Sequence, residues 1–257
     1  MGRLHIFKFE DLEWFPSLLR NYGTDFLQFL SNKTKMYKPI IPILEKGIKR
    51  SQNNTIIDLA SGGGGCLLWL NETLKKNNPE LKIILTDYFP NIPAINHTKK
   101  KSANFDSIEN SVDARDVPKN LKGLRTQFLS LHHFKEEDAK AILQNAVTSN
   151  NPIAIFEAQE RSFSSIMAMF FSPITVLLAT PFITPFKLGI LLFTYLIPIV
   201  LIFIWWDRMV SCLRTCFMKK MVANLENTEE YDWDIYRIKS GPGVILYLLG
   251  TKNNNLY

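Results

Sequence analysis

Residues 53–70, NNTIIDLASGGGGCLLWL, place four consecutive glycines between two apolar runs. The first run, around Asp58, is short enough for a buried strand, and the second begins a helix that we expect over residues 66–76. A glycine-rich turn between strand and helix exposes backbone N–H groups and lets a ligand approach the main chain. A merely tight turn would not need four glycines, because each costs about 0.5–1 kcal/mol relative to alanine. The stretch therefore predicts a nucleotide-type binding site where the helix begins.

Two common versions of such a site fit the residues poorly. A phosphate-binding P-loop needs Lys and then Ser or Thr after the last glycine, and Cys66 and Leu67 stand there instead. The dinucleotide pattern G-x-G-x-x-G would place its third glycine at Leu67 or Leu68. The first version is excluded, and the second is disfavoured.

The residues from Asp58 to Gly64, DLASGGG, resemble the D/E-x-G-x-G-x-G signature of class I S-adenosylmethionine-dependent methyltransferases. Ala60 stands where the first glycine is usual, and its side chain is small. The resemblance implies S-adenosyl-L-methionine as cofactor, with an acidic side chain facing its cationic and amine groups. The cofactor-binding residues implied in this turn are Asp58, Ala60, Ser61, Gly62 and Gly64.

Two later stretches continue the resemblance in the same order. The run KIILTDYFPN contains Asp87, 23 positions after Gly64 (87 − 64), where the family binds the ribose hydroxyls. A carboxylate accepts two hydroxyl hydrogen bonds at once, and Tyr88 or the next residue, Phe89, would pack on the adenine. An ordinary helix cap is the alternative for Asp87. In SVDARDVP, Asp113 and Ala114 resemble the pair of an Asp and a small residue that the family's third strand brings to the edge of the adenine. A position in a solvated loop is equally compatible with these residues.

Candidate catalytic residues follow the fourth and fifth predicted strands. TQFLSLHHF resembles the family's stretch near the methyl-transfer centre, and a histidine of pKa near 6.5 suits proton removal from a nucleophile. His132 and His133 are therefore candidate bases, with helix capping as the alternative. Glu157 and Glu160 lie where open α/β sheets place ligand sites, beyond the carboxyl ends of strands. Cys212 and Cys216 share a helical face without further ligands nearby, so we expect packing and no metal site.

The order of short apolar runs and amphipathic segments predicts an α/β fold. Strands alternating with helices form a mostly parallel, doubly wound sheet, here the Rossmann-like methyltransferase sheet. YDWDIYRIKS and GVILYLLGTK, joined by Gly241-Pro242-Gly243, predict an antiparallel hairpin at the C-terminal edge. The N-terminal FEDLEWFPSLLRNYGTDFLQFL resembles the helical cap over the cofactor, and a second helix is expected over 37–50. We expect further strands at 56–59, 81–85, 128–131 and 153–156, and a helix at 136–147.

Residues 163–206 contain Lys187 as their only charged residue. Segments 163–182 and 188–206 each reach the length of a membrane span, and Trp205 and Trp206 suit an aromatic belt. We expect an inserted transmembrane helical hairpin with both flanks in the cytoplasm. Three interrupting prolines keep a re-entrant or interfacial hairpin as a competitor, and a buried soluble core is a third possibility. Basic residues outside both ends agree with insertion: Arg161, Arg208, Arg214, Lys219 and Lys220.

The chain thus divides into a cap (1–52), a cofactor-binding core (53–161), a hydrophobic insertion with a flanking helix (162–220) and C-terminal strands (221–257). Its 257 residues, 46% of them apolar, suffice for a sizeable core. Three cysteines give no disulfide framework, which favours a reducing cytoplasm. The net charge is +6. The basic residues flank the apolar segment and form no stripe, so a membrane partner is favoured over nucleic acid.

These expectations combine into a membrane-associated methyltransferase that modifies an oxygen or nitrogen of a hydrophobic or lipid-like acceptor, with the catalytic domain facing the cytoplasm. One alternative is a membrane-anchored enzyme acting on a soluble small molecule or protein. Another is a membrane module that binds S-adenosylmethionine without turnover.

Overall fold

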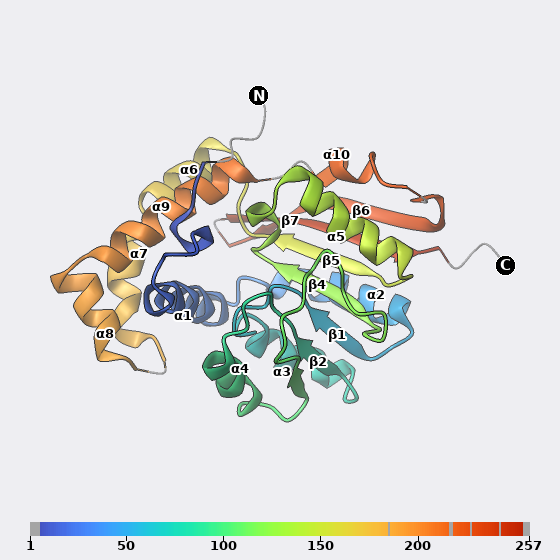
Figure 1. The fold of residues 1–257 in the computed structure, drawn as a ribbon, viewed down its shortest axis with the longest axis horizontal. Helices are drawn as coiled ribbons and strands as arrows, with labels where there is room; N and C mark the ends of the chain where they lie inside the picture. The colour runs from blue at the N-terminus through green and yellow to red at the C-terminus, as the bar shows by residue number, and fades with distance from the viewer. Residues whose placement is uncertain (1–5, 185, 216–217, 227, 242, 254–257) are drawn as a thin grey trace.

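The computed structural model describes residues 6–184, 186–215, 218–226, 228–241 and 243–253. Figure 1 shows a twisted sheet covered by helices. The helices between residues 163 and 214 form a separate lobe on one side. The expectations for Cys216 and Pro242 lie outside the described residues.

The sheet has seven strands in the order β3-β2-β1-β4-β5-β7-β6. The first five are parallel, and β7 and β6 add an antiparallel hairpin next to β5, as expected. The chain order reverses between β1 and β4, and such a switch point opens a crevice at the carboxyl ends of the strands. The strands are β1 (Thr55–Asp58), β2 (Lys82–Leu85), β3 (Phe105–Ser107), β4 (Leu124–Phe128), β5 (Ile153–Glu157), β6 (Tyr231–Ser240) and β7 (Gly243–Lys252).

Helices cover both faces of the sheet and form the lobe. The α-helices are α1 (Ser17–Thr34), α2 (Ile41–Ser51), α3 (Leu67–Asn77), α4 (Ile92–Lys99), α5 (Glu136–Thr148), α6 (Phe163–Phe170), α7 (Ser172–Ala179), α8 (Leu188–Leu191), α9 (Ile199–Arg214) and α10 (Met218–Val222). Short helical turns are η1 (Phe9–Asp11), η2 (Lys38–Ile40), η3 (Leu131–His133), η4 (Thr180–Phe182), η5 (Leu192–Leu196) and η6 (Thr228–Glu230).

Two hydrophobic cores sandwich the sheet because successive strand residues point to opposite faces. Ile56 of β1 packs in the core that holds α2 and α3. Its neighbour Ile57 packs in the other core, with α5 and α10. Residues 136–147, expected as a helix, form most of α5, and the apolar face predicted there is buried.

The lobe has a core of its own that includes the N-terminal helix. Phe26 of α1 is fully buried and packs in one cluster with Val176 of α7 and Phe203 of α9. Helix α2, assigned to the same cap from sequence, packs instead on the sheet. The N-terminal helix and the hydrophobic insertion therefore form one structural unit.

The two continuous apolar helices expected at 163–182 and 188–206 are each broken. Pro173 and Pro181 lie in the first turns of α7 and η4, and Pro198 caps α9, as expected for a residue that lacks a backbone N–H. Within the described residues, no helix is by itself long and apolar enough to span a membrane. Two pairs meet the requirements of length and composition together, Phe163–Phe170 with Ser172–Phe182 and Leu188–Leu196 with Ile199–Arg214, but they bend by 43° and 79°.

The fourth strand begins and ends earlier than the expected 128–131. β4 spans Leu124–Phe128, and Leu129 has a φ of 51°, which ends the extended conformation. The middle residues of β4, Arg125, Thr126 and Gln127, are polar, so the sequence does not show the apolar run that predicts a buried strand. Thr126 and Arg125 are nevertheless fully buried, and their side chains donate hydrogen bonds to Asp58 and Asn145.

Three of the four glycines in the β1–α3 turn are packed against other parts of the chain. A Cβ atom on any of them would strike a neighbour at a distance that packed atoms do not adopt. The neighbours are Ala94 of α4 at 2.7 Å from Gly63, Leu85 of β2 at 2.4 Å from Gly64, and Gln28 of α1 at 1.8 Å from Gly65. Only Gly62 has room, with Thr24 at 3.4 Å.

Gly64→Ala should therefore destabilise the fold more than Gly62→Ala. Both positions have positive φ, 69° and 61°, which costs a side chain about 1–2 kcal/mol. The clash with buried Leu85 adds overpacking of about 1–3 kcal/mol at Gly64 only. Urea unfolding measures the two losses. Equal losses would contradict the packing explanation.

Candidate functional site

Asp58 ends β1 at the crevice of the sheet. Its side chain is buried, and its Oδ1 accepts a hydrogen bond of 2.7 Å from Thr126 Oγ1. Burial, with a smaller contribution from Asp87, raises the pKa of Asp58 to about 7. A cation bound beside this carboxyl group would favour its ionised form.

Asp87 follows β2 and bonds the glycine turn. Its Oδ2 accepts the Gly62 N–H at 2.7 Å, and its Oδ1 accepts the Phe89 N–H at 2.8 Å. Burial raises the pKa of Asp87, although these backbone donors oppose the shift. Ala60 adopts a left-handed φ of 53°, and the buried Ser61 hydroxyl has no hydrogen-bond partner in the described chain. The turn residues named from sequence are therefore gathered at one strand edge.

The expected adenine-binding residues lie next to Asp87. Tyr88 and Phe89 are 52% and 73% exposed and contact each other edge to face, with centroids 4.8 Å apart. Asp113 and Ala114 occupy a loop well beyond the end of β3, and the preceding Val112 N–H donates to Asp87 O at 2.9 Å. Ala114 is buried, but both oxygens of Asp113 bind Arg115, which lowers the pKa of Asp113. The loop is adjacent to the site, while the Asp113 carboxylate is directed to Arg115.

His132 and Glu157 form a buried pair at the ends of η3 and β5. The His132 Nδ1 lies 2.7 Å from Glu157 Oε2, and the His132 backbone N–H donates to Glu157 Oε1 at 3.2 Å. The Gln159 amide nitrogen lies 3.0 Å from the same Nδ1. Burial lowers the pKa of His132 well below its usual value, so the imidazole is neutral, and burial raises the pKa of Glu157 to about 7.

The N-terminal segment reaches this pair through Lys8. The Lys8 Nζ lies 3.1 Å from Nε2 of both His132 and His133 and forms an ion pair with Glu10. Burial opposes ionisation of Glu10, but the adjacent Lys8 ammonium outweighs it, and the pKa of Glu10 falls to about 2.

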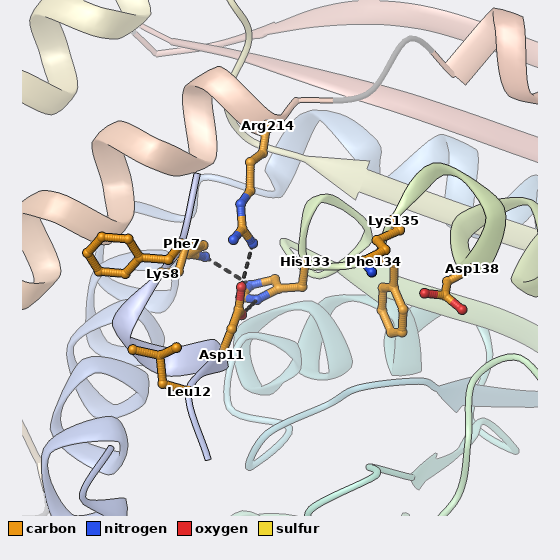
Figure 2. A pocket seen from close by; sticks show the side chains of 9 residues that line it. All are labelled: Phe7, Lys8, Asp11, Leu12, His133, Phe134, Lys135, Asp138 and Arg214. Carbon is orange, nitrogen blue, oxygen red and sulfur yellow. Dashed lines mark hydrogen bonds and ion pairs between the residues drawn. The ribbon is translucent and has the colours of Figure 1, made fainter. Parts of the chain in front are cut away.

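A second ion pair continues the network toward the lobe. His133 Nδ1 lies 2.6 Å from Asp11 Oδ1, and Asp11 binds Arg214 at the end of α9. Figure 2 shows Lys8, Asp11, His133 and Arg214 converging on one point between the N-terminal segment and η3. His133 is therefore part of an ion-pair network, whereas His132 contacts the acidic partner at the strand end.

A cavity of about 400 Å³ adjoins this network. Its lining combines charged groups, including Lys8, Asp11 and Lys135, with the apolar side chains of Leu12 and Phe134 (Figure 2). A smaller cavity of about 120 Å³ lies between α1 and α4. Within the described residues, no group of three or more His, Cys, Asp or Glu side chains could hold a metal.

Several site residues have partners that sequence reasoning did not identify. Lys8, Glu10 and Asp11 were read only as part of a helical cap, and Asp207 and Arg214 as part of the insertion. Apart from the Lys8–Glu10 ion pair, these site contacts join residues more than 100 positions apart, so spacing carries no signal for them. Glu160, the other acidic candidate after β5, forms an ion pair with Arg237.

Comparison with known proteins identifies the fold. No protein-family model matches the sequence, and a search of curated proteins finds no significant relative. Among solved structures, the plantazolicin methyltransferase BpumL in complex with SAH is 14% identical, with a TM-score of 0.53 over 92% of this chain and 88% of that one.

Other similar structures are longer than this chain. An uncharacterised O-methyltransferase structure from Nostoc punctiforme is 13% identical, with a TM-score of 0.50 over 92% of this chain and 61% of that one. The chain spans 57% of an O-methyltransferase family protein from Burkholderia thailandensis, with 14% identity and a TM-score of 0.48. The similarity to BpumL confirms the expected Rossmann-like methyltransferase fold.

Proposed function

We propose that this protein is a membrane-associated, S-adenosylmethionine-dependent methyltransferase that acts on an oxygen or nitrogen of a hydrophobic or lipid-like acceptor. One observation carries the proposal. The glycine turn with Asp58 and Asp87 shares one edge of the sheet with the His132–Glu157 pair. A glycine turn suited to the cofactor and a candidate base at the same edge of the sheet together support the proposal.

The residues around the turn fit S-adenosylmethionine. A Cβ at Gly62 would meet Thr24 only at 3.4 Å, so this side of the turn is the least crowded, and the Ser61 hydroxyl is buried without a partner in the described chain. The Asp87 carboxylate is suited to the ribose hydroxyls, and the exposed rings of Tyr88 and Phe89 to the adenine. Asp58 would face the cationic part of the ligand. When bound, the cofactor supplies an electrophilic methyl group.

His132 has the protonation state that a base requires. Lysine only donates hydrogen bonds, so Lys8 Nζ donates to a lone pair on His132 Nε2. The ring proton then resides on Nδ1 and is donated to Glu157 Oε2. Nε2 thereby carries the lone pair that would take a proton from an acceptor once Lys8 is displaced, and Glu157 would stabilise the imidazolium that forms.

The lobe carries most of the large apolar side chains that the described chain exposes. Contiguous exposed apolar surface marks a membrane or protein interaction site. Its most exposed members are Phe163, Leu178, Phe182, Phe186, Leu188 and Leu196, each at least 64% exposed. We infer that the lobe inserts into one leaflet as a bent, interfacial element and presents lipid-like acceptors to the site. The exposed Lys219 and Lys220 beyond α9 favour a cytoplasmic position for the sheet, whereas the expected flanking residue Arg214 is buried and ion-paired with Asp11.

Calorimetric titration with S-adenosylhomocysteine tests the cofactor site. The wild-type protein should bind with affinity on the order of micromolar. Asp87→Ala should weaken binding by about 100-fold, because charge-assisted hydrogen bonds to the ribose are lost. The control Asp106→Ala removes an exposed carboxylate within the neighbouring strand β3 and should bind like wild type. Equal binding by Asp87→Ala would exclude this site.

The Glu157→Gln variant tests the raised pKa of Glu157 in its buried pair with His132. A carboxyl group whose pKa is higher in the folded state stabilises the fold below its unfolded pKa, and this contribution is lost as pH rises through the folded pKa. Between pH 5 and pH 8, wild type should therefore lose about 1–3 kcal/mol more free energy of unfolding than Glu157→Gln. Urea unfolding at both pH values measures this, with Glu160→Gln as the control that behaves like wild type. Parallel pH profiles for wild type and Glu157→Gln would contradict the assignment.

Vesicle flotation tests the lobe. Replacing Leu178 and Leu196 together by Glu should reduce binding to phospholipid vesicles at least about tenfold, because each leucine contributes about 1.5–3 kcal/mol when buried in an apolar phase. Tyr236→Glu, at a 64% exposed position on β6, should bind vesicles like wild type. Undiminished flotation of the double variant would reject the membrane contact.

A further inference from the structure

Lys8 is a buried ammonium group that fills the space in front of the candidate base. Its side chain is 1% exposed, and its three donors face His132 Nε2, His133 Nε2 and a carboxylate oxygen of Glu10. An ammonium has three N–H groups, so these contacts satisfy it completely. Lys8 Nζ therefore occupies the position from which an acceptor would hand its proton to His132.

Both imidazoles are arranged to receive a donor at this point. His133 accepts from Lys8 at Nε2 and donates its Nδ1 proton to Asp11, as His132 donates its own to Glu157. Two lone pairs and one carboxylate therefore converge on a single nitrogen. An alcohol has one proton to donate and no charge, so it would satisfy only part of this arrangement.

The acidic groups around Lys8 Nζ also favour a cation at this position. Glu10 and Asp11, with depressed pKa values, lie beside Lys8, and Asp207 lies behind the segment. Arg214 adds a positive charge nearby, and it forms an ion pair with Asp11. Removing the Lys8 ammonium without replacement would leave the partly buried Glu10 carboxylate, 27% exposed, without this ion-pair partner.

The segment that carries Lys8 is held by the lobe. The Phe7 carbonyl accepts a hydrogen bond of 3.0 Å from Trp206 Nε1, and the Phe9 and Glu10 backbone N–H groups donate to Asp207 at 2.7 and 3.0 Å. These α9 contacts hold the segment from one side. The 400 Å³ cavity adjoins the same segment, and its lining places the apolar side chains of Leu12 and Phe134 near Lys8.

We propose that Lys8 is a tethered stand-in for the methyl acceptor, and that the acceptor is a primary amine attached to an apolar group, whose ammonium displaces Lys8 from His132 and His133. This inference rests on the proposed function and narrows its acceptor to nitrogen. The acceptor ammonium loses one proton to His132 Nε2 and becomes a neutral amine. Its nitrogen lone pair forms the new N–CH₃ bond as the S–CH₃ bond breaks with its electron pair retained by sulfur, which yields a secondary ammonium and a thioether.

Octylamine and octanol, matched in their apolar chain, test the inference without any cofactor. Hydrogen–deuterium exchange of wild-type protein should become faster at residues 6–12 with octylamine, because the Phe9 and Glu10 amides leave Asp207, and should not change with octanol. Equal effects of the two probes, or no effect of octylamine, would overturn the proposal.

Lys8→Met supplies a second measurement. Without a competing ammonium, this variant should bind octylamine at least about tenfold more tightly than wild type by calorimetry, which is 1.4 kcal/mol. Lys135→Met, which removes another lysine from the same cavity, should bind like wild type. Unchanged octylamine affinity in folded Lys8→Met would contradict the proposal, and the exchange measurement decides if that variant does not fold. If octylamine displaces Lys8 in a protein that does not bind S-adenosylhomocysteine, the methyltransferase assignment is contradicted and the amine site still stands.

Discussion

The turn after β1 is fixed by close approaches that only glycine permits. Helix α1, helix α4 and strand β2 contact residues 63–65 from three sides. The Asn32 side chain of α1 adds two hydrogen bonds, donating to Gly65 O at 2.5 Å and accepting from Trp69 N at 2.9 Å. Held in this way, the turn directs the Gly62 N–H at Asp87 and leaves Gly62 less crowded than the three glycines that follow it. The cofactor site depends on packing within the protein as much as on ligand chemistry.

The hydrophobic lobe reaches the site along two routes. Helix α1 shares the core of the lobe and also packs on the glycine turn. The N-terminal segment is bonded to α9 and places Lys8 against the two histidines. The lobe is therefore integrated with both the cofactor turn and the candidate base. A displacement of the lobe at a membrane would be transmitted to each of them through these contacts.

Local chemistry made much of this architecture predictable from sequence. The glycine turn, the Asp87 position and the C-terminal hairpin each depend on neighbouring residues and their spacing, and each is found where expected. β4 was misplaced because its buried residues are polar and find partners in distant elements. The bends at Pro173 and Pro198 follow from proline chemistry, but their angles depend on tertiary packing.

The contacts of Lys8 could not be predicted from sequence for a different reason. Its partners lie 124 and 125 positions away, and a charged residue near the N-terminus is ordinarily solvated. Burial of this lysine depends on the path of the segment over α9, which only the tertiary structure defines. The adjacent histidines were visible as candidate bases, but their tautomers depend on Lys8, Asp11 and Glu157 together.

The central claim is that the β1–α3 turn and the end of β2 bind the cofactor. Hydrogen–deuterium exchange with and without S-adenosylhomocysteine locates the ligand directly. Exchange should become slower at residues 58–65 and 86–89, because the ligand would cover both segments at the crevice of the sheet. Unchanged exchange in these two segments, or slowing confined to α6–α9, would contradict it.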